Sequence, residues 1–332
     1  MTNLKNFIQK SKNSQFKIEK MSEQKIKYFL SMFVEYILDD NITKKLSKLA
    51  VLETGFGNVK DKITKKNNKT KGLFNDLNKV NFDDQFIKYQ EISKPVGLII
   101  GITPSTNPVT TCINYFMNSF RCKNSIIIIP NLRTYKTINK LIKLIKLFLR
   151  NNNLPPYLIN LPTENLIRSD ELITLFDLSN KIIITGGGQY LSSAVSKTKT
   201  PILSFGKGNP PIIIDKKISI PNAIKNIIIS KSFDFSTSCS SDSVIIADIN
   251  IYQNVIKELI KQNCYILNED EKTHLSKIYL KKGVINPSLV AKNPNIILKK
   301  IGVKKIKNYK LIIFTADFKD NKKYLFNEKI SP

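Results

Sequence analysis

The 332-residue chain has no tryptophan, one histidine and only four cysteines. The cysteines are scattered without any CxxC spacing, which argues against a disulfide framework and against a zinc site. Apolar runs are short, as in SIIIIP at 125–130, and none approaches the ~18 residues that a membrane helix needs. The first twenty residues are basic but lack the continuous apolar region of a secretory signal. Together these absences predict a reducing, cytoplasmic location, with no membrane segment and no metal.

Arginine is also scarce, although the net charge is +27: only four of the 53 basic residues are arginine. Proteins that bind phosphates or base edges tend to use the bidentate fork of arginine. Here lysine is spread along the chain beside abundant isoleucine and asparagine, as an AT-rich coding sequence would supply. The charge therefore favours a basic solvated surface over a nucleic-acid partner. A nucleic-acid-binding protein stays open as a weaker hypothesis.

Hydrophobic periodicity predicts helices in the first part of the chain, at 22–40 and 42–55. The Lys- and Asn-rich stretch 60–84 is expected to be irregular. From residue 85 onward, short apolar strands alternate with amphipathic helices, which indicates a parallel sheet covered on both faces. The expected strands are 85–92, 95–102, 125–130, 157–161 and 181–184, then 211–215, 243–249 and 264–267. The pattern predicts an α/β protein of two doubly wound units, residues 1–205 and 206–332.

Three strand-to-turn junctions carry candidate chemistry. In GLIIGITPSTNPVTT (97–111), Asn107 offers an amide N–H that could stabilise a developing negative charge. A plain Asn-Pro turn that caps the following helix is the stronger interpretation of this motif alone. In KIIITGGGQYLSSAV (181–195), a glycine run precedes a helix whose first N–H groups could bind phosphate, although such runs are often only flexible turns. In PILSFGKGNPPIIID (201–215), the glycine spacing indicates either a close backbone approach or an interdomain loop.

Cys239 lies in the hydroxyl-rich stretch KSFDFSTSCSSDSVI (231–245), between a helix and a strand. The only histidine, His274, lies in a charged helix-like stretch, so a Cys–His hydrolase is improbable. Backbone N–H groups and nearby positive charge could still favour the Cys239 thiolate. The other three cysteines, Cys112, Cys122 and Cys264, are interpreted as structural.

Taken together, these stretches resemble the aldehyde dehydrogenase superfamily, specifically its coenzyme-A-acylating branch of acetaldehyde, succinate-semialdehyde and sulfoacetaldehyde dehydrogenases. The resemblance runs from LAVLETGFGNVKDK (49–62) through KPVGLIIGITPSTNP, TGGGQYLSSAVSKTKTPILSFGKGNPPIIID and SFDFSTSCSSDSVII to FNEKISP at the end. It implies that a short-chain aldehyde is oxidised to its acyl-CoA, with NAD or NADP as cofactor and coenzyme A as acyl acceptor. It also implies a homo-oligomer, provided that the C-terminal part found in family members is supplied.

The resemblance implies a role for each matching residue. Cys239 would be the nucleophile, and the Asn107 amide and the backbone N–H of Cys239 would hold the oxyanion. Arg133 matches a segment near the adenosine ribose, and Glu328 matches the glutamate that contacts the nicotinamide ribose. Further positions would line the cofactor: Thr103, Pro104, Thr185, Gly186 and Gly187.

Differences from the family pattern qualify these expectations. Hydrolytic family members carry a glutamate at the position of Ser204, and its absence fits transfer to a thiol rather than to water. Phe235 replaces the usual asparagine before the nucleophile. Family members also continue for roughly another quarter of their length past the position of Pro332, so the second domain is expected to be incomplete. The alternative is a catalytically impaired remnant that at most binds nucleotide or a homologous subunit.

Overall fold

The computed structural model of the protein describes residues 2–80, 85–86, 89–90, 93–186, 188–281, 284–316 and 327–332. The chain divides into two compact units. The first unit contains Met1–Thr54 and Lys62–Phe205, and the second contains Gly55–Asp61 and Gly206–Pro332. A short segment from the N-terminal part of the sequence therefore groups with the second unit.

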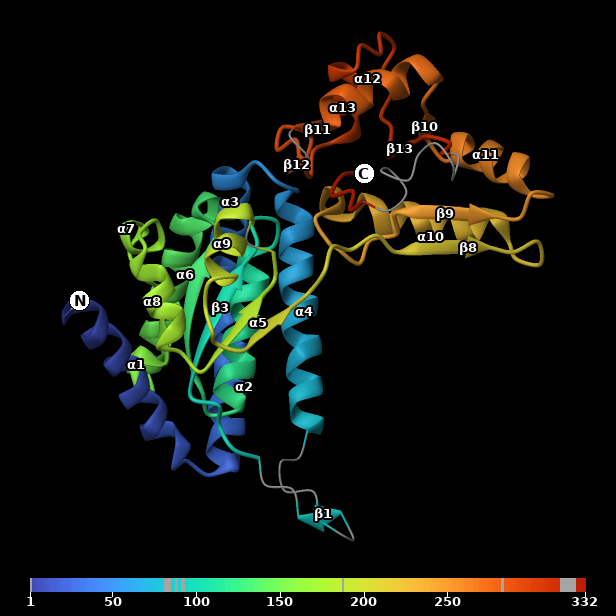
Figure 1. Cartoon of the computed structure of the whole chain (residues 1–332). Helices are drawn as coiled ribbons and strands as arrows, with labels where there is room; N and C mark the ends of the chain where they lie inside the picture. Colours follow the sequence, from blue (N-terminus) through green and yellow to red (C-terminus); the bar gives the residue numbers. More distant parts are fainter. Residues whose placement is uncertain are drawn as a thin grey trace. The chain divides into compact units, whose positions relative to one another are not determined.

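The first unit is built on a five-stranded parallel sheet in the order β5-β4-β3-β6-β7 (Figure 1). Its strands are β3 (Leu98–Thr103), β4 (Ser125–Pro130), β5 (Ile159–Asn160), β6 (Lys181–Ile184) and β7 (Ile202–Ser204). β3, the first of these five strands in sequence, thus lies in the middle of the sheet, and the strand order reverses between β3 and β6. The expected strand at 85–92 instead contains a small antiparallel hairpin of β1 (Gln85–Phe86) and β2 (Tyr89–Gln90), and its other residues lie outside the described ones.

Helices cover both faces of this sheet, as the continuous apolar strands predict. In β4, Ile126 and Ile128 join one apolar cluster, while Ile127 and Ile129 join another on the opposite face. The helices of the unit are α1 (Thr2–Glu19), α2 (Glu23–Ile37), α3 (Asp40–Thr54), α5 (Pro108–Arg121), α6 (Tyr135–Asn151), α7 (Glu164–Ile167), α8 (Glu171–Asp177) and α9 (Gly188–Val195), with the 3₁₀ turns η1 (Leu132–Thr134) and η2 (Pro156–Leu158). The stretch LIRSDELITLFDLS (166–179) has the apolar pattern of a single helix, but the chain breaks there between α7 and α8.

The expected irregular segment at 60–84 is wrong for most of its length, because α4 (Val59–Lys79) is a helix of 21 residues. Its buried face carries lysines where an amphipathic helix would carry apolar residues, so the apolar periodicity is weak. Lys66 is 1% exposed, and its ammonium group donates to the Ile37 carbonyl and to Thr43 Oγ1. Burial lowers the pKa of Lys66 to about 8. Polar tertiary contacts, invisible to a hydrophobic pattern, thus hold this helix.

The second unit has two separate pairs of parallel strands. β8 (Pro211–Ile214) pairs with β9 (Val244–Ala247), and β10 (Cys264–Ile266) pairs with β13 (Leu311–Ile313). The other elements are α10 (Ile220–Ser232), η3 (Phe233–Ser236), α11 (Tyr252–Lys261), α12 (Glu269–Tyr279), β11 (Leu280–Lys281), β12 (Val284–Ile285) and α13 (Pro294–Lys300). Apolar side chains of α10, α11, β10 and β13 form one core cluster. No helix within the described part of the chain is both long and apolar enough to cross a membrane.

Candidate active site

The carboxyl ends of β3 and β6 form the point at which the strand order of the first unit reverses, and open α/β sheets bind ligands at such points. Thr103 ends β3, and Thr185 follows β6 directly. The Thr103 side chain is fully buried, and its hydroxyl has no hydrogen-bond partner among the described residues. Because buried hydroxyls are normally bonded, this group is a candidate ligand contact.

Tyr115 supports this point through two hydrogen bonds of its hydroxyl, a role that no sequence motif indicated. Gly101 has no side chain, and a Cβ there would lie 2.6 Å from the Tyr115 ring. The ring therefore packs against β3 at Gly101, and its hydroxyl lies 2.7 Å from Thr185 Oγ1 and donates to the Ile102 carbonyl at 3.3 Å. Burial raises the pKa of Tyr115 to about 12, which keeps the hydroxyl protonated.

The turn after β6 approaches the turn after β3 closely. Gly186 has φ +75°, a left-handed conformation that disfavours side chains, and a Cβ there would lie 3.0 Å from the Pro104 Cβ. Pro104 and Gly186 thus lie close together at this edge of the sheet. Gly187 lies outside the described residues, and α9 begins at the next residue.

Arg133 lies in η1, just beyond the carboxyl end of the neighbouring strand β4, and its side chain is exposed. Its backbone N–H donates to Asn131 Oδ1 at 3.1 Å, which fixes the turn that carries it. The following helix, α6, is capped by the Glu53 carboxylate, which accepts the N–H groups of Lys136 and Thr137, each at 2.8 Å. The exposed guanidinium is therefore carried by a well-anchored turn.

Asn107 precedes α5 but does not cap it, because its side chain makes no capping bond to that helix. Instead, Lys65 Nζ donates to Asn107 Oδ1 at 3.0 Å. Lysine has no acceptor, so the amide oxygen must face the ammonium group, and the amide N–H groups must point elsewhere. Lys62 Nζ donates to the Thr106 carbonyl at 3.0 Å and holds the same turn. The two lysines come from α4, which the sequence analysis expected to be irregular.

In the second unit, Cys239 is an exposed free cysteine on a strained turn. Three consecutive non-glycine residues before it, Asp234, Phe235 and Ser236, have φ values of 51°, 49° and 61°. A left-handed conformation costs a residue with a Cβ roughly 1–2 kcal/mol, so other contacts must hold this turn. Such strain is common where a side chain is presented for function.

Asp234 supplies those contacts. It is fully buried, and its carboxylate accepts the Asn58 N–H at 2.9 Å and the Thr237 hydroxyl at 2.5 Å. Its own N–H donates to Asp61 Oδ2 at 2.8 Å, and the Asn58 side-chain amide donates to the same oxygen at 2.7 Å. The segment Gly55–Asp61 therefore clamps the turn.

A glycine lies directly against the nucleophile candidate. A Cβ on Gly208 would lie 2.1 Å from the Cys239 carbonyl oxygen, so no other residue fits without moving the turn. The Gly208 N–H donates to Glu328 Oε1 at 3.2 Å, and Lys329 Nζ donates to Asn209 Oδ1 at 2.6 Å. Burial raises the pKa of Glu328, an effect that the Gly208 N–H partly offsets. The close backbone approach expected from the glycine spacing is thus present, and Glu328 belongs to the surroundings of Cys239.

The other cysteines have different surroundings. Cys112 and Cys264 are buried, and burial raises the pKa of both thiols. Cys122 is exposed, and partial burial still raises its pKa. Within the described ranges, no group of three or more His, Cys, Asp or Glu side chains could hold a metal ion.

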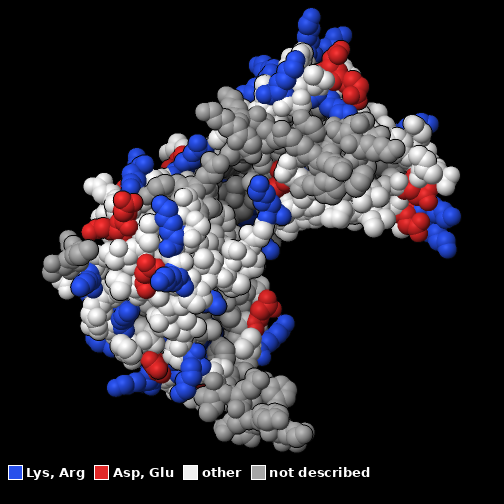
Figure 2. Space-filling view, in the orientation of Figure 1, with Lys and Arg blue, Asp and Glu red and all other residues white. Residues whose placement is uncertain are grey.

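The predicted residues therefore fall into two groups, each described within its own unit. The first unit brings together Thr103, Pro104, Thr185 and Gly186, with Arg133 one strand away and Asn107 at the start of α5. The second unit brings together Cys239 and Glu328. On the face shown in Figure 2, lysine and arginine side chains are scattered among acidic ones rather than gathered in one patch.

Comparison with known proteins identifies the family. The aldehyde dehydrogenase family model matches residues 2–275. A sulfoacetaldehyde dehydrogenase from Acholeplasma sp. is 31% identical over 98% of this chain, which spans 69% of that protein. An acylating sulfoacetaldehyde dehydrogenase from Bilophila wadsworthia is 33% identical over 80% of this chain, and the match spans 58% of that protein. The crystal structure of an acetylating aldehyde dehydrogenase from Geobacillus thermoglucosidasius aligns with a TM-score of 0.89 and 30% identity, covering this whole chain and 74% of the other.

The α/β fold and these matches thus define a family of dehydrogenases that act on aldehydes. The chain belongs to the aldehyde dehydrogenase family, and the relatives named above include acylating members of it. This confirms the family and the α/β fold that the sequence motifs indicated. The chain is shorter than these relatives.

Proposed function

We propose that this chain carries the machinery of a CoA-acylating aldehyde dehydrogenase, with Cys239 as the nucleophile. The observation that supports this most directly is the exposed Cys239 thiol, fixed by a clamped left-handed turn against Gly208. A thiol without a histidine partner suits attack on an aldehyde, whose carbonyl carbon needs no departing amine or alkoxide to be protonated.

The chemistry starts when the Cys239 sulfur attacks the aldehyde carbon, so that a C–S bond forms and the carbonyl electrons move to oxygen. The Asn107 side-chain N–H and the Cys239 backbone N–H stabilise that negative oxygen. Collapse of this thiohemiacetal expels a hydride from carbon and leaves an acyl thioester on Cys239. The thiolate of coenzyme A then attacks the thioester carbon, and the Cys239 thiolate departs.

NAD(P)+, when bound, supplies the hydride acceptor, and the first unit offers residues that fit it. The buried Thr103 hydroxyl has no hydrogen-bond partner among the described residues, at the point where the strand order reverses, and Gly186 allows a close backbone approach there. The exposed Arg133 lies one strand away, where it could meet a ribose phosphate and tolerate NADP+ as well as NAD+. Glu328 is proposed as the contact to the nicotinamide ribose, and Gly187 as a further lining residue.

The identity of Ser204 supports transfer of the acyl group from Cys239 to coenzyme A rather than to water. This residue ends β7 with an exposed side chain, at the position where the family resemblance implies a glutamate in hydrolytic members. A hydroxyl cannot activate water as a carboxylate does at neutral pH. The Bilophila relative is itself named as acylating, and two relatives are named for sulfoacetaldehyde. A small aldehyde of that class is therefore the first substrate to try. Cytoplasmic location and homo-oligomer formation stay predictions.

The test is formation of reduced cofactor from sulfoacetaldehyde, succinate semialdehyde and acetaldehyde, with and without coenzyme A. Cys239→Ala should lower the turnover rate at least about a thousandfold. Cys122→Ala, the matched change at the other exposed cysteine, should leave the rate unchanged. Equal rates for Cys239→Ala and the unmodified chain would disprove the mechanism. Cofactor binding without turnover of any aldehyde would favour the remnant that only binds nucleotide.

A further inference from the structure

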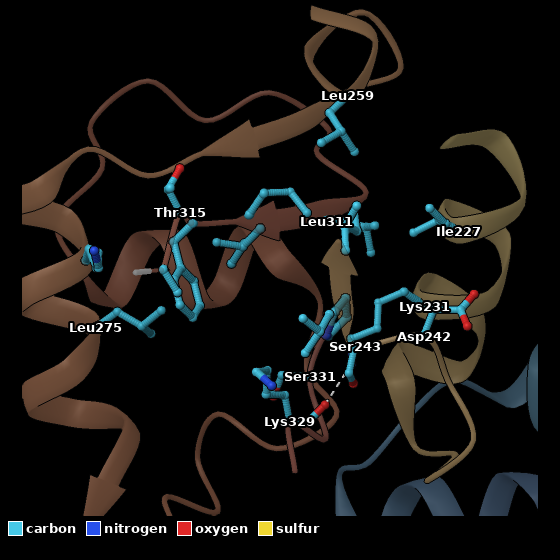
Figure 3. Close-up of a pocket in the computed structure, with 18 of the residues that line it drawn as sticks. Ile227, Lys231, Asp242, Ser243, Leu259, Leu275, Leu311, Thr315, Lys329 and Ser331 are labelled. Atoms are coloured by element: carbon cyan, nitrogen blue, oxygen red, sulfur yellow. Dashed lines mark hydrogen bonds between the residues drawn. The ribbon is translucent and has the colours of Figure 1, made fainter. Parts of the chain in front are cut away.

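Buried lysines hold polar groups in both units, and one of them bonds to a side chain with proposed chemistry. In the second unit, Lys231 lines an apolar cavity of about 260 Å³, and its ammonium group donates to Ser243 Oγ at 2.9 Å (Figure 3). A hydroxyl can accept such a bond and still rotate its own hydrogen. In the first unit, Lys65 donates to the side-chain oxygen of Asn107. A planar amide has its acceptor at one end and its donors at the other, so this bond fixes both ends.

A second Asn-Pro pair in the chain shows what such an asparagine ordinarily does at a helix start. Asn293 precedes Pro294 at the start of α13, with ψ 134°, and its side-chain oxygen accepts the N–H of Asn295 at 2.9 Å. This is the usual capping bond of asparagine. Asn107 precedes Pro108 at the start of α5, but its ψ is 54° and its side chain makes no capping bond. The two turns therefore differ in the partner of the amide oxygen.

Lys65 takes the amide oxygen that α5 would otherwise use. It lies on the buried face of α4, is 6% exposed, and its Nζ lies 3.0 Å from Asn107 Oδ1. Lys62, one turn earlier on the same face, donates to the Thr106 carbonyl at 3.0 Å and holds the backbone before Asn107. By analogy with α13, the competing donor is the N–H of Val109, the second residue of α5. A charged donor makes the stronger hydrogen bond, so the ammonium group keeps the oxygen.

We propose that Lys65 is a positioning residue, which keeps the Asn107 amide from capping α5 so that its N–H groups serve the oxyanion. This rests on the proposed function, in which the Asn107 side chain stabilises the negative oxygen of the thiohemiacetal. The ammonium group also draws electron density toward the amide oxygen. Hydrogen bonds in a chain polarise one another, so the N–H groups at the opposite end become stronger donors. Without the ammonium group, Asn107 turns to cap α5, as Asn293 caps α13.

Hydrogen exchange tests this competition without any turnover. In Lys65→Met, the amide of Val109 should exchange about fivefold more slowly relative to Phe116 in the middle of α5, which is the effect expected of one N-cap bond. Loss of a lysine would thus protect the start of a helix, which loss of a merely structural contact does not do. The slowing should disappear when Asn107→Ala is added to Lys65→Met, because no side-chain oxygen is then left to cap α5.

The matched control is Lys62→Met, a change of the same kind on the same face of α4. It leaves Lys65 bonded to Asn107 Oδ1, so the amide of Val109 should not slow. Unchanged or faster exchange of Val109 in Lys65→Met would overturn the proposal. If that variant does not fold, the unmodified chain still decides. Val109 should then be less protected than Asn295, each relative to the middle of its own helix, and equal protection would show that Asn107 already caps α5.

Turnover provides a second and independent test. Asn107→Ala should lower kcat about a hundredfold or more, the usual cost of losing one oxyanion donor. Lys65→Met should lower kcat at least about tenfold with the cofactor KM nearly unchanged, but should cost less than about twofold when added to Asn107→Ala, whereas Lys62→Met should cost the same factor in both backgrounds. An equal loss from Lys65→Met in both backgrounds would mean that Lys65 does not act through Asn107. If the unmodified chain oxidises no aldehyde, the proposed function fails, and exchange at Val109 still decides this inference.

Discussion

Removing the Asp234 carboxylate should destabilise the second unit by about 3–5 kcal/mol. In Asp234→Ala, the Asn58 N–H and the Thr237 hydroxyl both lose the carboxylate that accepts their hydrogen bonds. Asp234 and Thr237 are almost fully buried, so water cannot readily replace that carboxylate. Each hydrogen bond to a charged group contributes about 1.5–3 kcal/mol. The left-handed conformations of Asp234, Phe235 and Ser236 then lack the contacts that offset their strain. Asp234→Asn keeps one acceptor oxygen and should cost only about 1–2 kcal/mol.

Urea unfolding followed by far-UV circular dichroism measures this effect through the change in midpoint. Asp242→Ala is the control, because Asp242 lies in the same loop but is only half-buried, and it should change the free energy of unfolding by less than about 0.5 kcal/mol. A loss below about 1 kcal/mol for Asp234→Ala would refute the clamp. As a second measure, a thiol reagent should modify Cys239 faster in Asp234→Ala than in the protein that keeps Asp234. Both proteins would carry Cys122→Ser, so that the other exposed cysteine does not react.

Two further variants test the strain and the buried charge of the same unit. Ser236→Gly should stabilise the protein by about 1 kcal/mol in urea unfolding. Glycine adopts the φ of 61° without strain, and the change also removes a buried hydroxyl that has no partner among the described residues. The control is Ser238→Gly, which should destabilise the protein because Ser238 has no positive φ. Burial lowers the pKa of Lys231 to about 7, so the unfolded chain binds more protons and stability should rise from pH 7 towards the unfolded pKa near 10.5. Lys231→Met should flatten that rise, by at most about 3 kcal/mol between pH 7 and 9, and an unchanged slope would contradict this assignment.

The centre of the first unit's sheet was predictable because β3 and β4 are buried on both faces. SIIIIP at 125–130 is apolar at nearly every position, and β4 occupies those same residues. The helix α4 was not predictable in this way. Lys62, Lys65 and Lys66 occupy its buried face, and their ammonium groups bond to acceptors that are distant in sequence. Hydrophobic periodicity cannot detect a helix held by such contacts.

The same limit applies to the candidate site: some of its reactive residues could be predicted from the sequence, whereas the residues that hold them could not. Cys239 stood out because its neighbours are chemically unusual, whereas Asn107, Thr103 and Thr185 were assigned roles only through the resemblance to the family. The residues that hold them gave no local signal. Asp234 meets Asn58 across 176 positions of sequence, and a single sequence carries no record of that pairing. The left-handed Phe235 also stands where the family usually has asparagine, a residue that tolerates this conformation better.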